Sequence, residues 1–327
     1  MNEKALWLND VRAIACIMVV VLHTSAIYVL KADGLFWEIG NIFDSFSRVC
    51  VPLFFMISGY LFFAEKQVKI KNFNRLIIPL VFYSGIGLFF SFLSFKYGFI
   101  QTFNYNLLEA PLFYHLWYFY PLLLIYAISY FIKIRDNNIS IFLFSLLFLL
   151  FFVFCNPLVS NILEVFFEYQ FDNYFFIDGE FFFFLLYALI GALLRNASFS
   201  KKDPLLFFFG YIVVCVLIAF GTSNLHNTML YSYLNPMVAF SAICFFLFIK
   251  NTPKKNGIFS KFLDKVSNYS LGVYGIHAFV LLILEKMFNI KSINPMYGIV
   301  IFSFLVLFIS MFFSYCIRFF DKKGYIS

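Results

Sequence analysis

The first long apolar run of the chain reads Val11-Arg-Ala-Ile-Ala-Cys-Ile-Met-Val-Val-Val-Leu-His-Thr-Ser25, and it carries two ionisable side chains, Arg12 and His23. Apart from these two, the run is typical of a membrane-spanning helix. A guanidinium at the centre of such a helix costs about 3 kcal/mol or more. Because about three helical turns separate Arg12 from His23, both leave nearly the same face, about 16 Å apart along the axis. We expect this face to border a polar cavity rather than lipid.

The composition of the chain is that of a membrane protein. Of its 327 residues, 63% are hydrophobic and 13% are charged, whereas soluble domains are about a quarter charged. At about 20 residues a span, roughly ten spans use up the chain. The sequence therefore predicts an all-α polytopic membrane protein with about ten transmembrane helices, in a single membrane domain over residues 1–327.

The linkers between the apolar runs carry most of the 24 Lys and Arg residues, and their distribution predicts the topology. If the N-terminus is cytoplasmic, most of these residues fall on the cytoplasmic side, so the positive-inside rule places both termini there. The net charge of +7 then requires no nucleic-acid partner. Two outer linkers, 96–115 and 157–179, are long. The predicted spans are 8–30, 45–63, 76–95, 116–133, 139–156, 180–195, 205–221, 233–250, 268–287 and 296–317.

Three of the four histidines, His23, His115 and His277, fall in or at the rim of predicted spans. Such a histidine usually faces the interior of a helix bundle, where it holds a structural hydrogen bond or takes part in chemistry. His277 shares one helical stripe with Ser270 and Tyr274. Together with the arginine of the first span, they suggest a polar path that is cationic at its cytoplasmic end and lined by histidine further in.

Metal binding is not predicted. The six cysteines form no CxxC pair, which argues against both a disulfide framework and a zinc site, and the histidines lack the HxxxH spacing of metal ligands. Arg75 lies at the entry to the third span, where a guanidinium can hold a phosphate through two hydrogen bonds. Ser58 and Gly59 in the second span have the small side chains that let helices approach closely, so packing is the alternative interpretation of this pair.

Four segments resemble, in the same order, those of the acyltransferase type 3 family of integral membrane acyltransferases. They are Arg12 and His23 with ten residues between them, Phe54-Phe-Met-Ile-Ser-Gly-Tyr-Leu61, His115-Leu-Trp117, and Ser270-Leu-Gly-Val-Tyr-Gly-Ile-His277. The resemblance covers nearly the whole chain, with Ala13 in place of the glycine that is common after the arginine. The chain looks most like members that acetylate N-acetylglucosamine of enterobacterial common antigen, through the segments 7–12, 113–117 and 235–238.

The resemblance implies an acyl-CoA-dependent O-acetyltransferase, a multi-pass protein of the bacterial plasma (inner) membrane. It implies transfer of an acetyl group from cytoplasmic acetyl-CoA to a hydroxyl of a cell-envelope glycan or a lipid-linked sugar, without a metal. His23 is the candidate general base, since an imidazole with its ordinary pKa of about 6.5 suits that role near neutral pH. An acetyl group carried covalently on histidine is the open alternative.

The other polar residues take roles in the same interpretation. Asp10 either braces Arg12 or is an ordinary carboxylate at a helix start, and Trp117 either stacks on a sugar at the outer mouth or belongs to an interfacial aromatic belt. The candidate oxyanion donors are Ser58, Tyr274 and His277; the donor-binding residues are Arg12, Arg75 and Asp10; the acceptor-binding residues are His115, Trp117 and Arg48.

A proton-coupled transporter or a glycan exporter is the competing class, because buried Arg and His along a polar path also describe such proteins. The sequence contains no paired inverted halves, and carboxylates within the spans are few, Glu180 and Glu285 being the nearest. A purely structural membrane subunit does not explain polar residues at these depths. Binding of acetyl-CoA discriminates between the enzyme and the transporter.

Overall fold

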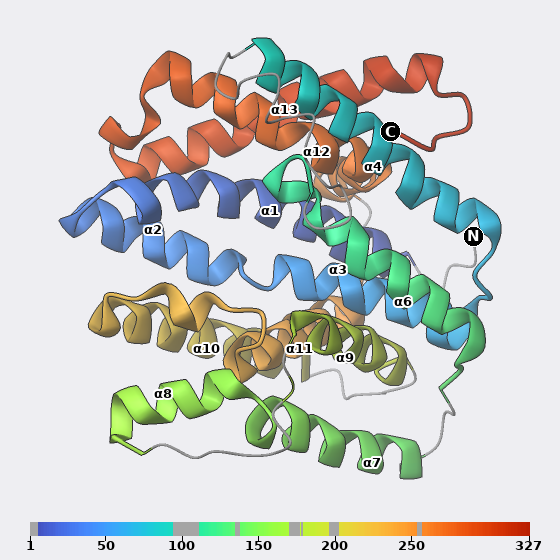
Figure 1. Cartoon of the computed structure of the whole chain (residues 1–327), viewed down its shortest axis with the longest axis vertical. Helices are drawn as coiled ribbons and strands as arrows, with labels where there is room; N and C mark the ends of the chain where they lie inside the picture. The colour runs from blue at the N-terminus through green and yellow to red at the C-terminus, as the bar shows by residue number, and fades with distance from the viewer. Residues whose placement is uncertain are drawn as a thin grey trace.

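The computed structural model describes residues 6–93, 111–134, 138–169, 177, 179–195, 203–253 and 257–327. All regular structure in these ranges is helical, which confirms the all-α fold. Most helices lie side by side in one bundle, and the two chain ends lie toward the same end of it (Figure 1). The helices are α1 (Trp7–Lys31), α2 (Gly34–Ser47), α3 (Cys50–Gly59), η2 (Tyr60–Glu65), α4 (Ile70–Leu93), η3 (Tyr114–Tyr118), α6 (Phe119–Phe131), α7 (Asn138–Leu149), η4 (Leu150–Phe154), α8 (Pro157–Phe167), α9 (Glu180–Leu193), α10 (Asp203–Leu225), η5 (Thr228–Tyr231), α11 (Pro236–Asn251), α12 (Ile258–Phe288), η6 (Ile290–Ser292) and α13 (Pro295–Phe320).

The number of helices that can cross a membrane agrees with a polytopic protein. Within the described ranges, 7 helices are long and apolar enough to do so, and the pair Ser145–Phe154 and Pro157–Phe167, bent by 56°, raises the number to 8. The predicted spans 116–133 and 180–195 correspond to the shorter apolar helices α6 and α9.

Helix α1 lies at the centre of the bundle and contacts α2, α3, α11, α12 and α13. Its buried side includes small residues, among them Ala13, Ala15 and Cys16. Small side chains allow neighbouring backbones to approach closely in a membrane bundle. The helix that carries Arg12 and His23 therefore faces protein on several sides, as its polar residues require.

The predicted second span, 45–63, begins too late, and its placement of Arg48 near the outer end of the span is wrong. The second span begins at Gly34 and continues through α2 and α3 to Ala64, so Arg48 lies near its middle. Hydropathy missed α2 because the helix is rich in polar residues. These side chains pair inside the protein: the Asn41 amide donates to the carbonyl oxygen of Ala219 at 2.9 Å, for example.

Helices α3 and α9 pack at very close range. A Cβ atom at Gly59 would overlap the backbone of Ala188, and one at Gly191 would overlap the backbone of Met56. Only glycine permits this approach on both sides. The packing interpretation of the Ser58-Gly59 pair is therefore confirmed for its glycine.

The first part of the predicted outer linker 157–179 is helical instead. Asn156 accepts a hydrogen bond from the backbone N–H of Leu158 at 3.0 Å, and Pro157 occupies the first helical position, so a new helix, α8, begins at this point. Most of the other long linker, 96–115, lies outside the described residues, as do 170–176 and 178.

Candidate functional site

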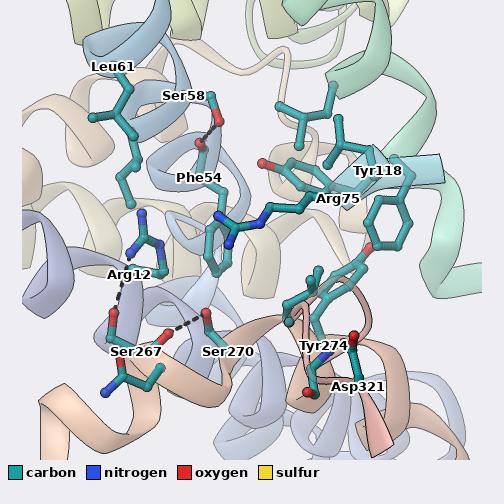
Figure 2. A pocket seen from close by; sticks show the side chains of 18 of the residues that line it. Arg12, Phe54, Ser58, Leu61, Arg75, Tyr118, Ser267, Ser270, Tyr274 and Asp321 are labelled. Carbon is teal, nitrogen blue, oxygen red and sulfur yellow. Dashed lines mark hydrogen bonds between the residues drawn. The ribbon is translucent and has the colours of Figure 1, made fainter. Parts of the chain in front are cut away.

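A cavity of about 610 Å³ lies beside the first turns of α1. Its walls come from α1, α3, η2, α4, η3, α6, α12 and α13, and from the chain that follows α13. Figure 2 shows the guanidinium groups of Arg12 and Arg75, on α1 and α4, pointing into the same space. Two of the predicted donor-binding residues, far apart in sequence, thus meet at one cavity.

The described lining of the cavity is strongly basic. Among its described side chains there is one carboxylate, that of Asp321, against five basic groups. The carboxylate is already engaged, because one of its oxygens accepts the backbone N–H groups of Ile326 and Ser327 at 2.6 and 3.3 Å. The cavity therefore suits an anionic ligand with several charges. The basic side chains are those of Arg12, Arg75, Arg318, Lys322 and Lys323.

Arg12 is held at the cavity by weak neutral partners. Its Nη1 donates to the side-chain oxygen of Asn9 at 3.3 Å and to the hydroxyl of Ser267, on α12, at 3.5 Å. Ser267 in turn accepts at its carbonyl oxygen from Ser270, as Figure 2 also shows. Asp10 lies half-buried on the same turn of α1. These long contacts orient the guanidinium and leave its remaining donors for a ligand.

The segment after α13 closes one side of the cavity. Besides the turn held by Asp321, the hydroxyl of Tyr83 on α4 donates to the carbonyl oxygen of Ile326 at 2.9 Å. This bond ties residues 321–327 back onto the bundle. Lys322 and Lys323 lie on this segment, so its folding places their charge beside the cavity.

Three histidines from different elements gather further along α1 and α12. The ring of His277 lies 5.1 Å from that of His23 and 5.2 Å from that of His115, measured between centroids. His115 and His277 are fully buried, while His23 is half-buried and also contacts the ring of Tyr114 at 5.3 Å. The structure thus places His23, the predicted base, next to His277. His115, which was predicted to bind the acceptor, lies in the same cluster.

Backbone hydrogen bonds fix the tautomers of two of these rings. A carbonyl oxygen only accepts, so His277 donates from Nδ1 to Tyr274 at 2.7 Å, and His115 donates from Nε2 to Gly275 at 3.2 Å. Each neutral ring keeps a lone pair on its other nitrogen. Within the described part of the chain, His277 Nε2 and His115 Nδ1 are buried and have no partner. Leaving such an atom unpaired costs about 1–3 kcal/mol, so both nitrogens favour a hydrogen bond from a hydroxyl group.

This arrangement differs from the sequence-based roles of the three candidate oxyanion donors. His277 uses its proton on the backbone and has a nitrogen free to accept. The hydroxyl of Ser58 donates to the carbonyl oxygen of Phe54 at 3.0 Å, and that of Tyr274 donates to the carbonyl oxygen of His115. Ser58 and Tyr274 both line the cavity, but each would have to exchange its bond to serve an oxyanion.

Tyr274 joins the cavity to the histidines. It lines the cavity, and its ring lies 5.7 Å from the ring of His115 and 5.8 Å from that of His277. The helical spacing of Tyr274 and His277 on α12 produces this contact, as the predicted polar stripe requires. The basic cavity and the histidine cluster are therefore two adjoining parts of one site.

Two predicted acceptor-binding residues lie in other surroundings. Arg48 forms an ion pair of 2.5 Å with Asp44, one turn earlier, and its guanidinium lies 4.4 Å above the ring of Tyr231. Trp117 packs against Phe184 and Tyr233, at 5.3 and 6.0 Å between ring centroids. Both residues have contacts that explain them as parts of the packed interior.

Sequence reasoning missed several residues of the cavity. Tyr118 directly follows the His115-Leu-Trp117 segment, and Tyr126 lies two helical turns further along. Asn9, which holds Arg12, lies one turn before it on α1, so a polar helical face was a usable signal for this residue. Arg318, Lys322 and Lys323 entered the topology only as cytoplasmic charges. In the ranges that the structure describes, no three His, Cys, Asp or Glu side chains are arranged to hold a metal ion.

One comparison with known proteins matches nearly the whole chain. A family model described as "Acyltransferase domain" matches residues 6–317. A serine/alanine racemase of Enterococcus gallinarum is 31% identical over 125 residues, which are 34% of this chain and 17% of the racemase. The chain thus spans less than a fifth of the length of that relative. No solved structure matches the chain.

Proposed function

The chain belongs to the acyltransferase type 3 family of membrane acyltransferases, and from this premise we propose that it transfers an acetyl group from cytoplasmic acetyl-CoA to a hydroxyl of a cell-envelope glycan or lipid-linked sugar. The observation that carries the proposal is that a strongly basic cavity adjoins a cluster of three histidines, two of which are fully buried. The first part suits a phosphate-bearing donor and the second suits activation of a hydroxyl.

The basic cavity is the proposed donor site. Coenzyme A carries a diphosphate and a further phosphate, and arginine binds such groups through paired hydrogen bonds. Arg12 and Arg75 face each other across the cavity, and Lys322 and Lys323 add charge from the segment after α13. The positive-inside rule assigns this end of the bundle to the cytoplasm, where acetyl-CoA is available.

The histidine cluster is the proposed site of proton transfer. The oxygen of the acceptor hydroxyl attacks the thioester carbonyl carbon, the hydroxyl proton passes to an imidazole nitrogen, and the carbon–sulfur bond breaks. The same imidazole returns the proton to the thiolate of coenzyme A. His23 remains the candidate base because it is half-buried and within reach of a substrate, and the free Nε2 of His277 lies on the adjoining ring.

The acceptor is proposed to reach the histidines from the end of the bundle opposite to the donor. His23 contacts Tyr114, which is 50% exposed, so the cluster has an aromatic border toward the surface. Aromatic rings suit the apolar faces of a sugar. N-acetylglucosamine of enterobacterial common antigen is the narrower acceptor that the resemblance of segments 7–12, 113–117 and 235–238 favours, in a protein of the bacterial inner membrane.

Donor binding by the purified full chain tests this function. In lipid nanodiscs, acetyl-CoA should raise the unfolding temperature of the protein, and coenzyme A should compete with it, whereas adenosine, which lacks phosphates, should have no effect. Transfer of labelled acetyl groups to an extract of envelope glycans should follow. Absence of both stabilisation and transfer would refute the proposal.

A further inference from the structure

The aromatic side chain of Tyr274 adjoins both the donor cavity and the histidine cluster. It borders the cavity on one side and contacts the rings of His115 and His277 on the other. Figure 2 shows Tyr274 at the edge of the space into which Arg12 and Arg75 point. A thioester held by the arginines therefore reaches the histidines past this ring.

The ring of Tyr274 is held in place. Its hydroxyl donates to the carbonyl oxygen of His115, so it is tied to a different segment of the chain. Tyr118 and Phe119 lie against it, at 5.8 and 5.5 Å between ring centroids, and both also line the cavity. A ring that is bonded at its tip and packed on its sides is a rigid boundary rather than a mobile one.

We propose that Tyr274 is a specificity-determining residue that limits the acyl group to a short chain. This inference rests on the proposed function. When the carbonyl carbon of the thioester lies at the histidines, the remainder of the acyl group has to fit beside the Tyr274 ring. An acetyl group adds one methyl group there, whereas a butanoyl group adds two further carbons that meet the ring or its neighbours. The ring thus selects by size and leaves the phosphate contacts unchanged.

Acyl-group selectivity of matched variants tests the proposal. Purified full-length protein in nanodiscs receives radiolabelled acetyl-, propanoyl- or butanoyl-CoA and an extract of envelope glycans, and the label transferred is measured. Tyr274→Leu should raise the ratio of butanoyl to acetyl transfer about tenfold, the size of effect that one or two methylene groups produce in an apolar pocket. Tyr274→Phe keeps the ring, so its ratio should stay within about threefold of the wild-type ratio.

The outcomes separate this inference from the function on which it rests. If Tyr274→Leu folds, transfers acetyl groups and keeps the wild-type ratio, the inference is wrong and the function stands. If Tyr274→Leu does not fold, Phe119→Leu, which removes a support of the same ring, decides: a raised butanoyl ratio supports the inference and an unchanged ratio overturns it. If the wild-type protein transfers no acyl group from any of the three thioesters, the proposed function fails, and this inference fails with it.

Discussion

His277 donates its Nδ1–H to the carbonyl oxygen of Tyr274, one turn earlier on α12, over 2.7 Å. This bond fixes the imidazole with a lone pair on Nε2, and the same turn of helix carries the aromatic ring that borders the basic cavity. One short piece of α12 therefore sets both an unpaired imidazole nitrogen beside the candidate base His23 and the boundary of the proposed donor site. The helix–helix contacts of α1 bring His23 to the same place.

His23→Ala should lower acetyl transfer at least about 100-fold, because general-base catalysis by a positioned side chain contributes about that much. His226→Asn is the matched control. His226 is the remaining histidine, it packs near Trp37, and asparagine tolerates its positive φ of 47°. The control should transfer acetyl groups like the wild type. Full activity of a folded His23→Ala protein would exclude His23 as the base.

Arg12→Ala should raise the KM for acetyl-CoA about tenfold and leave the KM for the acceptor within about twofold, since a charged contact to phosphate contributes about 1.5–3 kcal/mol. Lys261→Ala removes an exposed positive charge from α12, and Lys261 does not line the cavity. Steady-state kinetics of the two variants at one ionic strength separates a specific contact from a general field effect. Equal donor KM values for Arg12→Ala and wild type would count against the donor site.

Arg48→Ala should destabilise the protein by about 3 kcal/mol or more, because it leaves the fully buried carboxylate of Asp44 without its ion pair. The double variant Arg48→Met with Asp44→Leu should recover part of that loss. Thermal unfolding in nanodiscs measures both. An Arg48→Ala protein of unchanged stability that has lost affinity for the acceptor would restore the acceptor-binding role predicted from sequence.

Gly59→Ala should destabilise the contact between α3 and α9 by about 3 kcal/mol or more, because the added Cβ overlaps backbone that a side-chain rotation cannot move. Gly85→Ala, on α4, meets open space. It should be neutral, or more stable by up to about 1 kcal/mol, since alanine favours helix. The yield and unfolding temperature of the two proteins are compared. Equal values would mean that the two helices separate readily.

Long apolar helices were predictable from the sequence, and polar ones were not. The predicted spans 8–30 and 296–317 match α1 and α13 to within a few residues. Helix α12 begins ten residues before its predicted start, because Lys261, Asp264 and Lys265 lower its hydropathy. The polar residues of α2 likewise hid this helix from a search for apolar runs. Their hydrogen-bond partners lie elsewhere in the bundle, and the sequence does not reveal those partners.

In the candidate site, too, some residues were predictable from the sequence and others were not. Arg12 and Arg75 were identifiable because charge in or at the edge of an apolar run needs an explanation, and both line the cavity. The approach of His115 to His277 depends on how η3 enters the bundle, and the bond from Tyr83 to Ile326 links residues 243 positions apart. Such contacts follow from packing, and no local pattern encodes them.

Mass analysis of cell-envelope glycans tests whether the protein acetylates a glycan through His23. Glycans are compared from cells that carry the gene, cells that lack it, and cells in which the protein carries His23→Ala. We predict that the added mass of an acetyl group on a glycan sugar is present with the wild-type gene and absent from both of the other samples. Identical acetylation of every glycan in all three samples would contradict it.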